Sequence, residues 1–178
     1  MSHSYKSCVT LETVKEALNR ISPYVHQTPV LTCSTLDEIA TTNSGSKNQL
    51  KLHFKCENLQ KTGAFKARGA CNAILLAKSK GVNGIVTHSS GNHGQAVAWA
   101  SSTQVANLPC TVVVPKGTPQ IKCDAITGYG AELIFCDNSP TSRKETCEKI
   151  SIETGKHVVH PYDDYDILAG QVNIIYQK

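Results

Sequence analysis

Short apolar runs alternate with helix-like segments through the second half of the chain, and this alternation constrains the fold more than any other feature. The runs read GIVTHS (84–89), CTVVVP (110–115), AELIFCD (131–137) and HVVHP (157–161), and each is typical of a buried strand. The stretches that follow them, from GNHGQAVAWA to DYDILAGQ, have helical length and composition. Strands joined by helices in this way run parallel, with right-handed crossovers. The sequence therefore predicts an α/β fold with a parallel sheet.

Upstream of residue 84 the pattern predicts separate elements rather than a regular alternation. Thr10 is suited to cap the first of them, a helix whose apolar residues recur at helical spacing and which ends before Pro23. The predicted elements are a helix over 11–21, a short helix from Ser34, a polar loop over 41–48, a half-buried strand over 50–57 and a helix over 70–80.

Composition argues against several classes of function. The 178 residues carry a formal charge of +4, with lysines scattered rather than clustered, which argues against a nucleic-acid partner. No run approaches the roughly 18 apolar residues of a membrane span, and the first residues lack the apolar core of a secretory signal. The eight cysteines form no CxxC pair and the seven histidines no close ligand pair. We therefore expect a reduced, cytoplasmic protein without zinc.

Two stretches hold the residues suited to chemistry. Lys66 lies in KTGAFKARGA, and Ser90 lies in THSSGNHGQ, where a predicted strand ends and a helix begins. Free backbone N–H groups at such a junction bind carboxylate or phosphate groups, and ligands collect at this edge of parallel sheets. Taken separately, each stretch has a plain alternative: Lys66 is a solvated cation, and Ser-Gly-Asn is a helix cap and turn.

The two stretches belong to a series of six segments that run in order along the chain. They are HQTPVLTCSTL, FKCENLQKTGAFKARGA, VTHSSGNHGQAVAWA, VVVPKGTPQIKCDAI, YGAELIFCD and VVHPYDD-x3-LAGQ. Together they resemble the fold-type-II pyridoxal-phosphate enzymes, the serine racemases in particular, with the serine/threonine dehydratases as near relatives. The two serines before the glycine in THSSGNHGQ favour the racemases. The resemblance implies a three-layer α/β fold with a parallel sheet, of the tryptophan synthase β kind.

The resemblance also assigns roles to residues of the two stretches. It implies that Lys66 bonds to the aldehyde of pyridoxal 5'-phosphate, and that its freed amine and the Ser90 hydroxyl act on the substrate α-proton from opposite faces. Phe65 would pack against the cofactor ring, and Asn92 would hydrogen-bond its phenolic oxygen. The implied seat for the substrate carboxylate consists of Ser89, Ser90, Gly91, Asn92 and His93. The implied reaction converts L-serine to D-serine, with elimination to pyruvate as a side reaction.

Racemases of this family also bind ATP between subunits, and a homodimer is expected for the complete family member. The matching positions here are Ser34, Lys61, Thr62, Gln95 and Tyr129. The chain departs from the family pattern where Cys33 replaces a serine and Lys15 a glutamate, which weakens the nucleotide assignment. Asp163 and Asp164 look like a metal pair, but the family pattern makes them part of a strand-to-helix loop. We therefore expect no metal site in this chain, and Mg²⁺ only in the complete family member.

The resemblance runs from about residue 8 onward and covers about the first half of the family pattern. It implies an incomplete enzyme, with residues 1–84 as part of the large cofactor domain, 85–160 as the small α/β domain and 161–178 as the start of the return to the large domain. The glycine-rich loop that binds the cofactor phosphate belongs to the other half. Three interpretations stay open: a serine racemase, a serine/threonine dehydratase (an ammonia-lyase) on the same scaffold, and an inert fragment or partner of a full-length subunit.

Overall fold

A parallel sheet lies at the centre of the computed structural model, which describes residues 9–45 and 47–176. Its described strands are β3 (Ile85–His88), β4 (Cys110–Pro115), β5 (Glu132–Cys136) and β6 (His157–Val158), in the spatial order β5-β4-β3-β6. Neighbours pair in parallel, with Ile85 of β3 opposite both Cys110 and His157. The parallel α/β arrangement that the alternating runs predict is confirmed.

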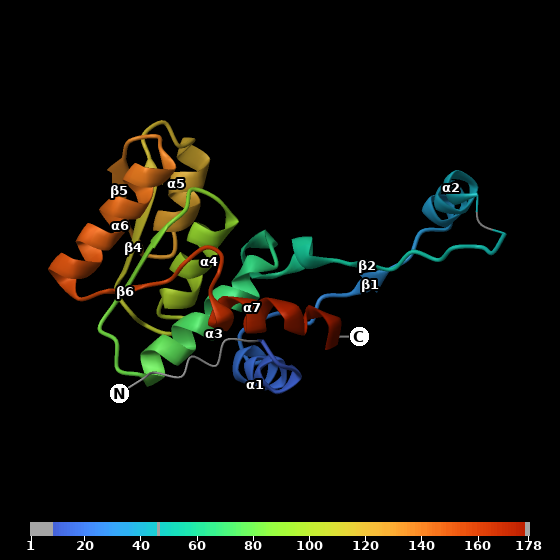
Figure 1. Ribbon diagram of the computed structural model, residues 1–178, viewed down its shortest axis with the longest axis horizontal. Coiled ribbons are helices and arrows are strands. Elements are labelled where there is room, and N and C mark those ends of the chain that lie inside the picture. Colours follow the sequence, from blue (N-terminus) through green and yellow to red (C-terminus); the bar gives the residue numbers. More distant parts are fainter. Residues whose placement is uncertain (1–8, 46, 177–178) are drawn as a thin grey trace.

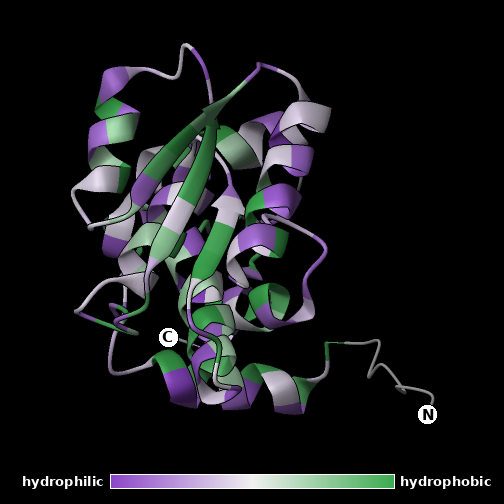
Figure 2. Ribbon diagram, turned by 90° about the vertical axis from the view of Figure 1, so that its left-hand side faces the viewer, coloured by the Kyte–Doolittle hydropathy of each residue, from purple (hydrophilic) through white to green (hydrophobic). Residues whose placement is uncertain are grey.

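Helices cover both faces of this sheet (Figure 1). They are α4 (Asn92–Ser101), α5 (Gln120–Thr127) and α6 (Pro140–Thr154). The core beneath α4 and α5 contains Val112 and Val114 of β4, whereas Val113 belongs to a second core with Cys147 and Ile150 of α6. Successive side chains of a strand point to opposite faces, so β4 supplies both cores. Figure 2 shows the result as largely hydrophobic strands between helices of mixed polarity.

Three further helices form a second part of the molecule, which includes the first described helix. They are α1 (Leu11–Ile21), α3 (Lys66–Ser79) and α7 (Tyr165–Val172), which continues into the 3₁₀ turn η3 (Asn173–Tyr176). Helices α3 and α7 cross closely, because a Cβ on Gly170 would lie 2.8 Å from the Arg68 carbonyl oxygen. This contact brings the segment after β6 beside the first turn of α3, where Lys66 lies.

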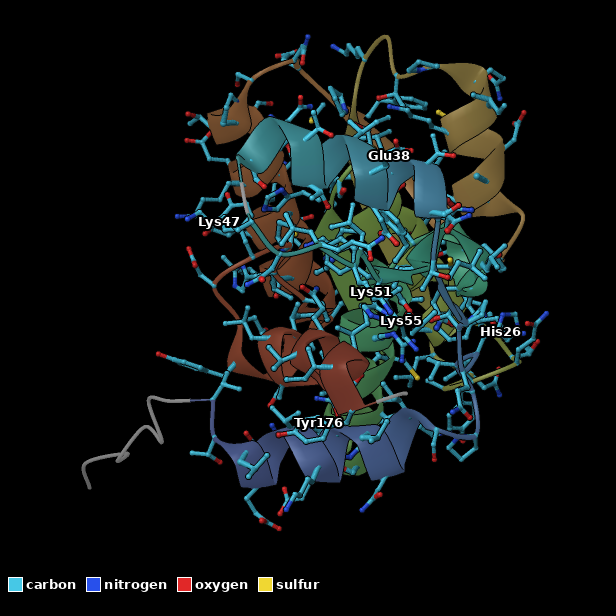
Figure 3. The ribbon with its side chains drawn as sticks, turned by 90° about the vertical axis from the view of Figure 1, so that its right-hand side faces the viewer. His26, Glu38, Lys47, Lys51, Lys55 and Tyr176 are labelled. Atoms are coloured by element: carbon cyan, nitrogen blue, oxygen red, sulfur yellow. The ribbon has the colours of Figure 1, made fainter. Side chains whose placement is uncertain are left out.

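An arm extends from this body. It consists of strands β1 (Val30–Leu31) and β2 (Phe54–Lys55), which pair antiparallel, and of helix α2 (Ser34–Ser44) at its far end (Figure 1). Figure 3 views the molecule along the arm, with Glu38 on α2 and with Lys51 and Lys55 on the returning segment. Apolar side chains on the arm are exposed, among them Leu31, Leu36, Ile39 and Phe54. Two short 3₁₀ turns, η1 (Glu57–Leu59) and η2 (Lys61–Gly63), connect the arm to α3.

Helix caps explain why several boundaries agree with the sequence. Thr10 accepts a hydrogen bond from the Thr13 N–H, and Ser139 accepts one from the Ser142 N–H. Asp164 caps α7 by accepting from the N–H groups of Asp166 and Ile167, so it does lie in a strand-to-helix loop, as the resemblance implies. Each cap satisfies N–H groups that the helix itself leaves unpaired.

The structure corrects the sequence prediction in the first half of the chain. Helix α2 extends to Ser44 and so takes the first part of the predicted loop over 41–48. The strand predicted over 50–57 shrinks to Phe54–Lys55, because only Val30–Leu31 is available to pair with it. Helix α3 begins at Lys66 rather than at residue 70. No helix in the described ranges is both long and apolar enough to span a bilayer. The domain boundaries at residues 84 and 160 stay a prediction.

Candidate active site

A hollow of about 690 Å³ opens at the carboxyl end of strands β3 and β6. Its walls come from three places: the end of β3 with the loop into α4, the first turns of α6, and the segment after β6. The lining residues are His88, Ser89, Ser90, Gly91, Pro140, Thr141, Arg143, Lys144, Glu145, Glu148, Pro161 and Tyr162. This edge of a parallel sheet is where ligands bind in open α/β folds.

Lys66 lies beside this hollow. Its Nζ donates to the carbonyl oxygen of Pro161 at 3.3 Å, and Pro161 is part of the wall. The ammonium also lies 5.2 Å from the centroid of the Phe65 ring, whose side chain is 41% exposed. Among the described residues no carboxylate forms an ion pair with Lys66 within 4.0 Å. Its amine therefore has a carbonyl contact that a ligand can replace.

A left-handed turn directs the chain into α3 just before Lys66. Thr62 has φ of 58° and Gly63 has φ of 69°. Glycine adopts this conformation without strain, but a β-branched threonine does so only when its surroundings hold it there. The turn contacts α4, so the start of α3 is fixed against the helix that carries the serine loop.

Residues 89–91, at the junction of strand and helix, form another part of the wall, as the sequence predicts. Gly91 is the N-cap residue of α4 and donates its N–H to Ser89 Oγ at 3.2 Å. Helix α4 lies tightly against the loop, because a Cβ on Gly94 would lie 2.1 Å from the Ser89 carbonyl oxygen. Ser89, Ser90 and Gly91 thus face the hollow that Lys66 borders. The arrangement places a nucleophilic amine, a hydroxyl and a helix N-terminus around one space.

The remaining members of the predicted carboxylate seat lie elsewhere. Asn92 is exposed and lines a smaller hollow of about 240 Å³. His93 is only 4% exposed, and its ring nitrogen Nε2 lies 3.2 Å from Thr87 Oγ1 in the core. The His93 side chain is therefore turned away from the hollow, and only its backbone N–H is suited to the seat. The seat as a whole stays a prediction.

The five predicted nucleotide residues are not gathered in one place. Gln95 lines the smaller hollow with Asn92 and with Ile121, Lys122 and Ala125 of α5. Tyr129 lines a different hollow near the end of α4, and Ser34 lies at the start of the arm helix. Lys61 and Thr62 belong to the η2 turn, which contacts α4. The nucleotide site stays a prediction, and Lys122, which sequence reasoning did not single out, lines the same smaller hollow as Gln95.

Sequence reasoning also missed Arg143, a cation of the main hollow. Arg143 lies in the first turn of α6, and its Nε donates to the Ser139 carbonyl oxygen at 3.4 Å. Burial lowers the pKa of His88, and the neighbouring charges of Arg143 and His160 lower it further. The Ser139 cap predicts that a helix starts at the ligand-binding edge, but it does not show which of its first residues face the hollow.

The class of protein follows from these features together with the comparisons. A parallel α/β sheet with a hollow that a lysine borders and a serine-glycine loop lines matches fold-type-II pyridoxal-phosphate enzymes, and residues 21–177 match the profile of the family described as "Pyridoxal-phosphate dependent enzyme". The chain therefore belongs to this family.

Within the family the chain is similar to racemases and dehydratases. Serine racemase of Dictyostelium discoideum is 46% identical over 92% of this chain and 48% of that protein. The β-hydroxyaspartate dehydratase of Paracoccus denitrificans is 41% identical over 91% of this chain and 49% of that protein. The crystal structure of a pyridoxal 5'-phosphate-dependent aspartate racemase superposes with a TM-score of 0.86, at 50% identity, over 95% of this chain and 50% of that chain. The chain thus spans about half the length of the curated relatives it matches.

The residues around Lys66 fit the cofactor of this family. The amine has no ion-pair partner among the described residues, and the exposed Phe65 ring lies beside it. A Cβ added at Gly91 would have Ser89 Oγ, at 4.0 Å, as its nearest neighbour, so the backbone there leaves room for a flat ring to approach. Lys66 and Phe65 thus fit the cofactor here, whereas Asn92 lines the smaller hollow, and its predicted contact with the cofactor stays a prediction.

Proposed function

We propose that the chain carries the reacting residues of a pyridoxal-phosphate dependent amino-acid racemase and dehydratase that acts on L-serine. One observation supports this most directly: the Lys66 amine contacts Pro161 in the wall of the same hollow that Ser90 lines. The similarity to serine racemases at 46% identity and to a dehydratase at 41% identity favours this pair of reactions. Threonine is a second substrate of the same class.

In this proposal, different groups of the protein transfer protons and bind the substrate carboxylate. Pyridoxal phosphate, when bound, supplies an electron-accepting ring that makes the α-proton of the attached amino acid acidic. The free Lys66 amine removes that proton at Nζ from one face, and Ser90 Oγ delivers a proton to the other face. Backbone N–H groups at the start of α4 hold the substrate carboxylate, since a helix N-terminus attracts anions. If the β-hydroxyl instead takes up a proton and leaves as water, hydrolysis of the product releases pyruvate and ammonia.

Replacing Ser90 by alanine is expected to separate the two reactions. D-serine formation should fall by about 10²-fold or more, because the second face loses its proton donor. Pyruvate formation from L-serine should remain within about threefold, since elimination needs only the Lys66 face. Chiral chromatography and a coupled pyruvate assay on the same samples give both rates. Ser102→Ala, at the far end of α4, is the matched control. Equal losses of both products in Ser90→Ala would contradict the two-base scheme.

A second candidate substrate class is the dicarboxylic amino acids. Two similar proteins are named for aspartate and for β-hydroxyaspartate. Arg143 lines the hollow, and no carboxylate of the described residues pairs with it within 4.0 Å. Lys144, by contrast, pairs with Glu148 at 3.8 Å. A planar guanidinium suits a second substrate carboxylate, because it offers parallel N–H donors.

Arg143→Met is expected to distinguish these substrates. If the chain acts on dicarboxylates, kcat/KM for L-aspartate and β-hydroxyaspartate should fall by about 10²-fold, the equivalent of a lost charged hydrogen bond. The same variant should change kcat/KM for L-serine by no more than about threefold. Lys144→Met removes a neighbouring charge and is the control. A wild-type chain that prefers L-serine over both dicarboxylates would rule out this candidate.

Several wider features belong to the same proposal. The described cysteines are free thiols, and burial raises the pKa of Cys71 and Cys147 to about 12 and that of Cys110 to about 11. Such thiols are unreactive, which suits a cytoplasmic protein. We infer a homodimer, and ATP and Mg²⁺ as regulators, only for a protein that also contains the other half of the family fold. A chain that is inert, or that pairs with a full-length subunit, is the non-enzymatic alternative.

A further inference from the structure

A buried chain of hydrogen bonds links the start of α4 to the segment that receives Lys66. The Thr87 hydroxyl, fully buried in β3, donates to the Val159 carbonyl oxygen at 2.7 Å. His93, in the first turn of α4, places Nε2 3.2 Å from the same hydroxyl oxygen. Pro161, two residues after Val159, accepts the hydrogen bond from Lys66 at 3.3 Å. The two sides of the candidate active site are thus connected through the core.

The donors and acceptors in this series of hydrogen bonds determine which ring nitrogen of His93 carries the proton. A hydroxyl donates only one hydrogen bond, and the Thr87 hydroxyl donates it to the Val159 carbonyl oxygen. The Thr87 oxygen then accepts a hydrogen bond from His93, so Nε2 of the ring carries the proton. Nδ1 carries a lone pair instead, in agreement with its burial without a hydrogen-bond partner. The ring therefore acts as a hydrogen-bond donor through Nε2.

The surroundings of His93 also keep its ring neutral. Burial lowers its pKa to about 4, against the opposing effect of a backbone hydrogen bond at Val159. The charges that act on the ring come from Lys66 on α3, His88 on β3 and His160 after β6, and all of them lower the pKa further. A protonated ring would face these cations without a carboxylate among them.

The helical turn that contains His93 packs directly against the serine loop. Its neighbour Gly94 packs directly under the Ser89 carbonyl, where no side chain fits. The Ser89 N–H in turn donates to the Val113 carbonyl oxygen at 3.1 Å. A shift of the ring therefore moves the first turn of α4, and the loop 89–92 with it. The Thr87 hydroxyl is the shared contact between this unit and the segment 159–161.

We propose that Thr87 and neutral, Nε2-protonated His93 are positioning residues, which fix the serine loop 89–92 relative to the segment 159–161 that receives Lys66. Their value for turnover rests on the proposed function, because it concerns the placement of Ser90 and the substrate carboxylate relative to Lys66. The link itself is a property of the folded chain and is measurable without cofactor or substrate.

The tautomer provides the first test. Long-range ¹H–¹⁵N spectra of the ¹⁵N-labelled chain should show His93 with a protonated Nε2 and a bare Nδ1 at neutral pH. The ring should take up a second proton only near pH 4, and the amides of residues 89–92 should shift with it. A protonated Nδ1 at neutral pH would overturn the proposal, as would a ring that titrates in its ordinary range near 6.5.

Hydrogen exchange on Thr87 variants provides the second test. Thr87→Val keeps the shape but removes the hydroxyl, so exchange of amides 89–93 and of 159, 160 and 162 should rise together, by about tenfold or more. Thr87→Ser should restore slow exchange in both segments. Thr111→Val is the matched control: Thr111 is equally buried, in β4, but bonds to Glu132 and Lys156 instead. Its effect should not concentrate in these two segments.

The outcomes separate the link from the function. If Thr87→Val and Thr111→Val raise exchange in the same pattern, Thr87 has only a structural role and the proposal is wrong. It is also wrong if exchange rises in 89–93 but not in 159–162, since the two segments are then independent. If both tests succeed but the chain does not bind pyridoxal phosphate through Lys66, the link between the two segments is supported and the proposed function is wrong.

Discussion

Replacement of Lys66 by alanine is expected to abolish covalent capture of pyridoxal phosphate. Borohydride reduction of the chain after incubation with the cofactor should label the peptide that contains Lys66, and peptide mapping should find no such label in the variant. The reason is position: Lys66 is half-buried beside the hollow, whereas most other lysines in the described ranges are exposed to solvent. Racemase and dehydratase turnover, where present, should fall by about 10³-fold or more.

Lys78→Ala is the matched control for this experiment. Lys78 lies on the same helix, in its last turn, and is exposed. It should leave the Lys66 label unchanged. Label spread over several lysines, or retained in Lys66→Ala, would show that Lys66 is not the cofactor lysine. A wild-type chain that takes up no label at all would support the non-enzymatic alternative, in which the other half of the family fold is needed to hold the cofactor.

The sheet could be predicted because its determinants are local. Buried strands such as Cys110–Pro115 are continuous apolar runs, and the helices between them begin at recognisable caps such as Ser139. The same rule placed the serine loop at the carboxyl edge, where the structure has it. Lys66 reached its proposed role through the resemblance, since nothing in the sequence around it distinguishes it from a solvated lysine.

What the sequence could not predict depends on tertiary contacts. The strand predicted over 50–57 has the right alternation, but only Phe54–Lys55 finds a partner. The resemblance implies that His93 belongs to the carboxylate seat, yet helical geometry turns its ring toward Thr87 in the core. Arg143 is more than 50 residues from the serine loop in sequence, and only the packing of α6 on the sheet brings the two to one hollow. Motif spacing carries no information about such pairs.

A buried ion pair at the start of α3 is expected to give the largest effect on stability. The Arg68 side chain is completely buried and donates to both carboxylate oxygens of Glu57, at 2.7 and 2.8 Å. The Thr28 hydroxyl donates to Glu57 at 2.6 Å. Burial acts to raise the pKa of Glu57, but the hydrogen bonds from Arg68 and Thr28 and the nearby positive charges lower it below its ordinary value. The carboxylate is therefore ionised and depends on Arg68.

Arg68→Met should lower the free energy of unfolding by about 3–5 kcal/mol, because it leaves Glu57 charged and largely without its partner. A domain of ordinary stability, about 5–15 kcal/mol, would then be close to unfolding. Urea denaturation monitored by the single Trp99 gives the measurement, and Trp99 is itself buried in the main core. A loss below about 1 kcal/mol would mean that water or rearrangement compensates Glu57, and that the pair does not hold the start of α3.

The double variant Glu57→Met with Arg68→Met makes this prediction specific. Removing both charges leaves no buried ion without a partner, so most of the loss in Arg68→Met should be recovered. The Thr28 hydroxyl would lose its acceptor, at a cost of about 1–3 kcal/mol if it finds no other, so recovery should be incomplete. Because Arg68 lies two residues after Lys66, the double variant also tests placement. It should fold, yet capture less pyridoxal phosphate than wild type if the ion pair orients the first turn of α3.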